Sequence, residues 1–111
     1  MCSSDLYDAH VGAELVIRRG SLRANARQVA ALKSELLAMI PRYGSLSLPV
    51  EMVHGDSDTV VPLEIHSAKL VTQIPDAVLT VLPGVGHMPH HTDPQAVTDA
   101  IDRAAARAGL R

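Results

Sequence analysis

Large aromatic side chains are almost missing from this chain. It has no phenylalanine and no tryptophan, and its aromatic residues are Tyr7 and Tyr43. Apolar residues still make up 47% of the 111 residues, mostly as alanine, valine and leucine. We expect one domain at most from the length of the chain, and a modest core, because the bulky aromatic residues that supply much of the buried area in a typical core are missing.

Cysteine and long apolar runs are also scarce. Cys2 is the single cysteine, which excludes an internal disulfide and gives no reason to expect an oxidising compartment. No stretch reaches the roughly 20 apolar residues of a membrane-spanning helix, and the first ten residues lack the basic start and apolar run of a secretory signal. These absences favour a cytoplasmic protein without a membrane partner.

Residues of one charge sign do not form a cluster in the sequence. The formal net charge is -2, and the arginines are scattered along the chain instead of forming one basic patch. Nucleic acid is therefore an unfavourable partner.

The N-terminal half contains one clear element. Residues 1–20 show no clean period and stay unassigned; within residues 1–6, "CSSDL" matches a translation of a common sequencing adapter, and we hypothesise that it is an artefact. Over residues 25–40, apolar side chains recur at steps of three and four, which predicts an amphipathic helix capped by Asn25 and ended by Pro41. Its apolar positions are Ala26, Val29, Ala30, Leu36, Leu37 and Ile40.

Residues 49–108 predict strand, helix, strand and helix. The strands are expected at 49–54 and 77–83, the second of them buried, and a helix at 62–74 would connect them. A helical crossover makes the two strands parallel. Parallel strands need neighbouring strands at both edges, and the sequence predicts one pair, so we expect an incomplete sheet. On the connecting helix, the side chains expected to face inward are Leu63, Ser67, Leu70, Val71 and Ile74.

The last helix has well-marked ends. Asp93 can cap it, Pro94 suits its first turn, and Gly109 suits the position just past its end. The spacing of its apolar residues predicts an inward face made of Val97, Ala100, Ile101, Ala104 and Ala108.

Two polar loops follow the predicted strands. "HGDSDTVVP" follows the first and "PGVGHMPHH" the second, and the carboxyl ends of parallel strands are where catalytic groups gather. A carboxylate bonded to an imidazole fixes its tautomer and stabilises the imidazolium, as a histidine that deprotonates a nucleophile requires. We expect Gly84 and Gly86 to permit the tight loop that carries His87.

Together these motifs resemble the C-terminal part of the α/β-hydrolase fold. His87 follows Asp58 by 29 residues and precedes "DPQAV", which opens a helix. The resemblance implies that Asp58 is the triad acid and His87 the general base, with no metal and no cofactor. The implied fold class is α/β, with residues 46–111 as the C-terminal part of the core and residues 21–45 as the end of a helical cap.

The nucleophile that this family requires is missing. No G-x-S-x-G motif occurs, "GSLSL" lacks the second glycine, and Ser57 lies between two carboxylates. We therefore interpret the chain as a C-terminal fragment, inactive alone, of a hydrolase of a small ester, C–C bond, epoxide or haloalkane. The nucleophile could be Ser, Asp or Cys, and the partner implied for the intact enzyme is its small-molecule substrate.

Other roles are open for the neighbouring polar residues. Asp56 competes with Asp58 for the acid role, although a turn residue bonded to its own backbone is the simpler interpretation. His54 suits a buried or bonded position at a strand end. His90 and His91 suit the surface or the rim of a pocket.

Two alternatives of other kinds remain. His87 could bind a metal with His90 or His91 and Asp93, but the histidines lack the i, i+4 spacing of a helical metal site. The chain could also be a small autonomous binding module that completes its sheet by oligomerising.

Overall fold

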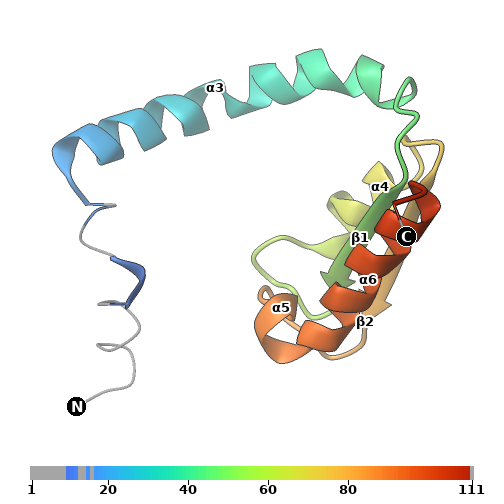
Figure 1. The fold of residues 1–111 in the computed structure, drawn as a ribbon. Coiled ribbons are helices and arrows are strands. Elements are labelled where there is room, and N and C mark those ends of the chain that lie inside the picture. Colours follow the sequence, from blue (N-terminus) through green and yellow to red (C-terminus); the bar gives the residue numbers. More distant parts are fainter. Residues whose placement is uncertain (1–9, 13–14, 16, 111) are drawn as a thin grey trace. The chain divides into compact units, whose positions relative to one another are not determined.

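The computed structural model describes residues 10–12, 15 and 17–110 (Figure 1). The expectations for Cys2 and for residues 1–6 lie outside these residues. The chain divides into two compact units, residues 1–41 and 42–111, which are described separately. None of the described helices combines the length and the apolar character needed to cross a bilayer.

The predicted helix of the first unit exists, but its predicted ends are wrong. Helix α3 spans Arg19–Tyr43, so Asn25 lies inside it and Pro41 lies in its last turn. A proline removes only its own N–H from the helical ladder, and two further residues complete the turn beyond it. None of the side chains of α3 is buried within the described part of the chain, and its predicted apolar face is therefore exposed.

The second unit is an α/β structure around two parallel strands. Strand β1 spans Val50–Gly55 and strand β2 spans Ala77–Leu82, with Val50 opposite Ala77 and Gly55 opposite Leu82. Both predicted strands are confirmed to within one residue, and so is their parallel direction. Among the described residues the sheet has these two strands alone, as the prediction of an incomplete sheet requires.

The connection between the strands is not the continuous helix that was predicted. It contains a 3₁₀ turn, η1, at Leu63–Ile65 and one α-helical turn, α4, at Ser67–Leu70. His66 separates them with φ -115° and ψ -93°, outside the helical region. The predicted inward positions are nevertheless covered, with Ile74 buried. The apolar spacing identified the buried face correctly but did not reveal the break.

The last helix, α6, spans Pro94–Arg107 and begins as predicted. The Asp93 carboxylate accepts a hydrogen bond from the Ala96 amide at 3.0 Å, and Pro94 is the first helical residue. Gly109 follows the helix with φ +73°, a conformation that glycine adopts without strain. The cap and both ends are therefore confirmed.

The inward face of α6 is narrower than predicted. Val97 and Ala104 are half-buried and Ala100 is buried, but Ile101 is 62% exposed and Ala108 is also exposed. A short helix, α5, at Pro89–Thr92 precedes α6. Both α5 and α6 contact β1.

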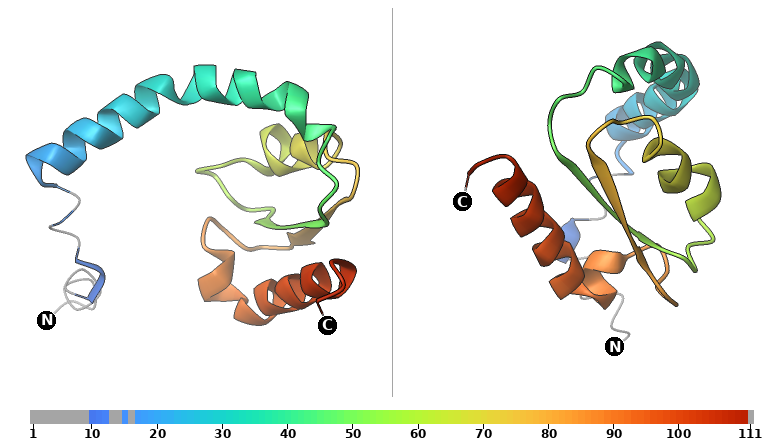
Figure 2. Two further views of the ribbon diagram at one scale, coloured as in Figure 1. Left: turned by 45° about the horizontal axis from the view of Figure 1, so that its top comes forward. Right: turned by 90° about the vertical axis from the view of Figure 1, so that its right-hand side faces the viewer.

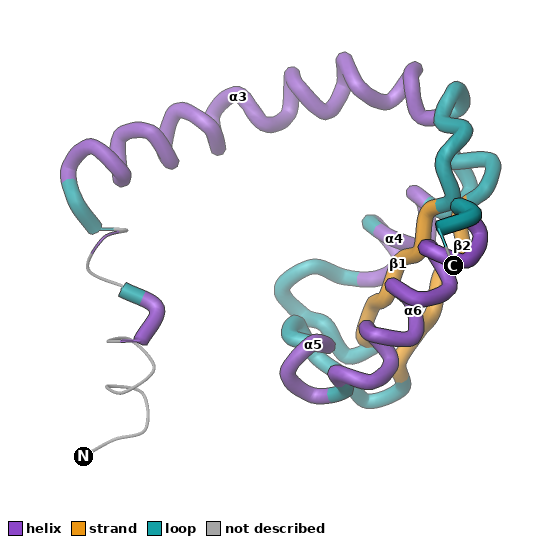
Figure 3. Tube along the Cα trace, viewed as in Figure 1, coloured by secondary structure: helices purple, strands orange, loops and turns teal. Residues whose placement is uncertain are grey.

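Helices cover both faces of the strand pair. Figures 2 and 3 show α5 and α6 on one face and η1 and α4 on the other. The core is small, with Ile74, Leu82, Val85 and Ala100 as its buried apolar residues in the described part. Strand β2 is only partly covered, because Val78 and Val81 are each 41% exposed, so the prediction of a buried strand is wrong for these two side chains.

Candidate active site

The loops that follow β1 and β2 are bonded to each other. The Asp56 amide donates to the Leu82 carbonyl at 3.1 Å, and the Ser57 amide donates to the Val85 carbonyl at 3.0 Å. At Gly55 the backbones come so close that a Cβ atom would lie 2.0 Å from the Val85 carbonyl oxygen. Only glycine fits there, and the close contact holds the two polar loops side by side.

Asp58 is buried and fully bonded. Its Oδ1 accepts hydrogen bonds from the Val60 amide at 2.9 Å and the Val61 amide at 2.8 Å. Its Oδ2 lies 3.0 Å from Nδ1 of His87, and its side chain is 6% exposed. Burial works to raise the pKa of Asp58, but the bonds from Val61, His87 and Val60 together lower it to about 2. The carboxylate is therefore ionised at neutral pH.

His87 presents its second nitrogen to solvent. Because an ionised carboxylate only accepts hydrogen bonds, Nδ1 of His87 must carry the proton that is donated to Asp58. The neutral ring then has its lone pair on Nε2. No group of the described residues bonds to Nε2, and the side chain is 45% exposed. The ring can accept a proton from an incoming group while Asp58 stabilises the resulting charge.

Asp56 holds the two loops together. Its Oδ1 accepts from the Gly84 amide at 2.7 Å and from the Ser57 hydroxyl at 3.0 Å. Its main partner is thus the backbone of the other loop, which corrects the simpler prediction of a bond to its own turn. Gly84 has φ +71°, as expected for the tight loop, whereas Gly86 has no positive φ, and no described atom lies within 4 Å of where its Cβ would stand.

The other two histidines that follow β2, His90 and His91, lie in helix α5. His90 and His91 are both exposed, and their ring centroids are 4.3 Å apart. Oδ1 of Asp93 is engaged in capping α6. No group of three or more His, Cys, Asp or Glu side chains among the described residues could hold a metal ion, so the metal hypothesis gains no support.

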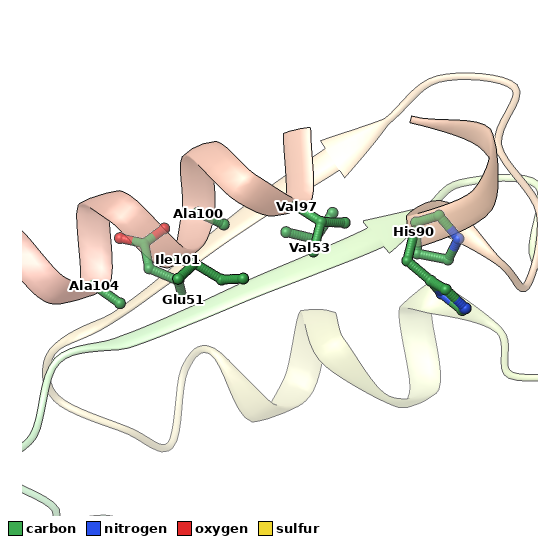
Figure 4. A pocket seen from close by; sticks show the side chains of 8 residues that line it. Glu51, Val53, His90, Val97, Ala100, Ile101 and Ala104 are labelled. Atoms are coloured by element: carbon green, nitrogen blue, oxygen red, sulfur yellow. The ribbon is translucent and has the colours of Figure 1, made fainter. Parts of the chain in front are cut away.

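Two cavities open on the sheet. One of about 250 Å³ lies beside Asp58 and His87, and it is also lined by His54, Ser67 and Pro89. The other, of about 340 Å³, lies between β1 and the last two helices (Figure 4). The larger cavity touches neither Asp58 nor His87. The smaller one is therefore the candidate site for chemistry, despite its size.

A charged cluster at the opposite end of the strands was not predicted. The Glu51 carboxylate, 4% exposed, accepts from Nε of Arg103 at 3.2 Å and from Nη1 of Arg107 at 2.7 Å. Arg107 also bonds Asp76 at 2.5 Å, and the bonds from Glu51 and Asp76 raise the pKa of Arg107. The sequence feature that could have predicted this cluster was a charged residue inside an apolar strand, together with two arginines four residues apart on a helix.

Comparisons with known proteins give no function. No family model matches the chain, and no solved structure matches it. It is 30% identical over 78 residues to an uncharacterized protein of Mycobacterium bovis and to counterparts in two strains of Mycobacterium tuberculosis. The match covers 69% of this chain but 23% of each relative, so the chain spans less than a quarter of their length.

Proposed function

We propose that residues 46–111 are the C-terminal acid–base part of an α/β-hydrolase-fold enzyme. In this proposal Asp58 is the triad acid and His87 the general base. The observation that supports it is the 3.0 Å contact between Oδ2 of Asp58 and Nδ1 of His87, formed by loops that leave adjacent parallel strands at their carboxyl ends. The motif resemblance and the chain order of acid before base agree with it.

The proposed chemistry is nucleophilic hydrolysis. A nucleophile from another segment of the enzyme attacks the substrate carbon, and Nε2 of His87 takes the proton from a hydroxyl or thiol nucleophile. The imidazolium, stabilised by Asp58, then gives that proton to the leaving group. Water next attacks the covalent intermediate and passes a proton to His87, which regenerates the nucleophile. No step needs a metal or a cofactor.

The nucleophile would determine the substrate. Serine or cysteine suits an ester, and serine also suits a C–C bond next to a carbonyl. Aspartate suits an epoxide or a haloalkane, where His87 acts on the water of the second step. We further propose that residues 21–45 belong to a helical cap, whose other helices would pack on the exposed apolar side chains of α3.

Expression of a longer polypeptide tests this proposal. The chain would be extended by the residues encoded upstream of Met1, and a fluorophosphonate probe would report a reactive serine. We expect the extended protein to be labelled, His87→Ala and Asp58→Asn to abolish labelling, and the exposed control Asp99→Asn to keep it. If an aspartate occupies the nucleophile position, hydrolysis of an epoxide replaces the probe as the readout.

The chain alone should remain unlabelled. Loss of the nucleophile lowers kcat by a factor on the order of 10⁶ in triad enzymes, and the sequence contains no G-x-S-x-G motif. Stoichiometric labelling of Ser57 or another serine in the isolated chain would contradict the proposal. So would an upstream sequence without any nucleophile motif.

A second candidate is an autonomous module that completes its sheet with another copy. In its favour, the described strands leave both outer edges unpaired, and Ile101 is 62% exposed beside the larger cavity. Size-exclusion chromatography and thermal circular dichroism separate the two candidates. A soluble oligomer with one cooperative transition favours the module, whereas aggregation or partial folding favours the hydrolase part.

A further inference from the structure

His54 is a buried histidine that the proposed mechanism does not use. It lies in β1 four residues before Asp58, and its side chain is 9% exposed. Nε2 lies 2.8 Å from the Val61 carbonyl oxygen and 3.5 Å from Oδ2 of Asp58. Nδ1 lies 2.5 Å from the Ser67 hydroxyl oxygen. The ring thus joins the strand, the loop that carries the acid, and helix α4.

These partners select one form of the ring. A carbonyl oxygen only accepts, so Nε2 must carry the hydrogen that is donated to Val61. A neutral ring then has its lone pair on Nδ1, and the hydroxyl of Ser67 can donate to it. Both nitrogens are satisfied by the Nε2-protonated tautomer without a charge on the buried ring.

The backbone of Val61 connects the ring of His54 to the carboxylate of Asp58. The Val61 carbonyl accepts from His54, and the Val61 amide donates to Oδ1 of Asp58. Val61 is therefore held at both of its backbone groups, and the Nε2–H of His54 also faces Oδ2. Loss of the His54 contact would release Val61 and would free Asp58 to turn away from His87.

We infer that His54, which the Val61 carbonyl keeps in the Nε2-protonated tautomer, is a positioning residue that holds the Asp58 carboxylate in line with His87. Its meaning for catalysis rests on the proposed function. The geometry can be tested in this chain by methods that need no catalytic activity. A failure of the inference can therefore be distinguished from a failure of the proposed function.

A pair of matched variants separates the two contacts of His54. In His54→Gln the side-chain amide reaches the position of Nε2 and keeps a donor for Val61. In His54→Asn the shorter amide reaches the position of Nδ1, so it keeps a contact with Ser67 but loses the donor to Val61. Ser67→Ala leaves the ring and removes its hydroxyl partner, and the exposed His66→Asn is the control.

Nuclear magnetic resonance provides the readouts. Long-range ¹H–¹⁵N correlation identifies the tautomer of His54, and ¹³C spectra follow the titration of the Asp58 carboxyl. We expect the Nε2-protonated form in the parent chain and also in Ser67→Ala, because the Val61 carbonyl still requires a donor at Nε2. His54→Asn should raise the pKa of Asp58 from about 2 toward 3.8 and weaken the Nδ1–H signal of His87, while His54→Gln should keep both.

Opposite results overturn the inference. An Nδ1-protonated His54 in the parent chain would do so, as would an Asp58 titration and a His87 signal that stay unchanged in His54→Asn. If His54→Asn fails to fold, Ser67→Ala decides, and an Nδ1-protonated His54 there refutes the role of the Val61 carbonyl. In the extended enzyme, the expected result for His54→Asn is a lower kcat with KM retained, and rescue by His54→Gln.

Discussion

The two ends of the strand pair each hold a buried carboxylate, but the cationic groups that face them differ. At the amino end Glu51 is bonded by Arg103 and Arg107, whose guanidinium groups stay charged at any pH of interest. At the carboxyl end Asp58 faces His87, whose imidazole, unlike a guanidinium, can exist as a neutral base. The first arrangement can only hold α6 against the strands, whereas the second can transfer a proton.

This difference predicts where substitutions affect stability and where they affect titration. The charged cluster at the amino end of the strands and the close backbone contact at Gly55 should determine much of the free energy of unfolding. The exposed ring of His87 should contribute little to folding but should control the ionisation of Asp58.

The largest loss of stability is expected at Gly55. In Gly55→Ala the new methyl would meet the Val85 carbonyl oxygen at 2.0 Å and its carbon at 2.5 Å, and the backbone cannot yield without separating the loops. We expect a loss of about 3 kcal/mol in the free energy of unfolding, measured with urea. Gly86→Ala is the control, because no described atom lies within 4 Å of its Cβ position. Equal effects at both glycines would contradict the close-approach argument.

A smaller loss is expected at Glu51. Glu51→Ala removes hydrogen bonds from two charged side chains and leaves a gap beside α6, which should lower the free energy of unfolding by roughly 1–3 kcal/mol. The exposed Glu64→Ala should change it by less than about 0.5 kcal/mol. If the two variants are equally stable, the amino-end cluster does not hold α6 in place.

The smallest loss of stability is expected at His87, whose side chain is 45% exposed, and this loss should be present at neutral pH and vanish in acid. His87→Ala should raise the pKa of Asp58 from about 2 toward 3.8, since the carboxylate loses one of its bonds. Asp58 stabilises the fold fully above its ordinary pKa of 3.8, and this contribution is lost as the pH falls through about 2.

The two titrations can be compared directly. The free energy of unfolding of His87→Ala should therefore be lower than that of the parent chain above pH 3.8, the difference should vanish as the pH falls through about 2, and ¹³C spectra should show the raised pKa of Asp58. His90→Ala, in the neighbouring helix α5, should leave both the stability and the pKa of Asp58 unchanged. Identical acid unfolding of the parent chain and His87→Ala would show that the contact does not persist in solution.

Much of the fold could be predicted because local patterns report local burial. Short apolar runs bounded by turns identified both strands, the period of about 3.6 residues identified the last helix, and the Asp93 cap was correct to the residue. Helix ends were less certain where they depended on single residues. Pro41 costs one hydrogen bond in a last turn instead of ending α3, and the break at His66 leaves no trace in the apolar spacing.

The candidate site could be predicted only in part. Asp58 and His87 were identified from the loops that follow two strands, because parallel pairing brings the carboxyl ends of strands together. The partners of His54 could not be predicted, since its bonds to Val61 and Ser67 depend on how η1 and α4 return to the strand. Gly55 was also missed, because its requirement comes from a backbone 30 residues away.

The sequence by itself determined the two strands and the last helix, the parallel direction of the strands and the meeting of an acidic loop with a histidine loop. The elements follow from local apolar patterns and caps, and the parallel direction follows from the crossover between the strands. The tertiary structure alone decided which nitrogen of His87 faces Asp58, what His54 holds, and that Arg103 and Arg107 close on Glu51. Such contacts join residues up to 56 positions apart, and their atoms come within bonding distance only when the chain is packed.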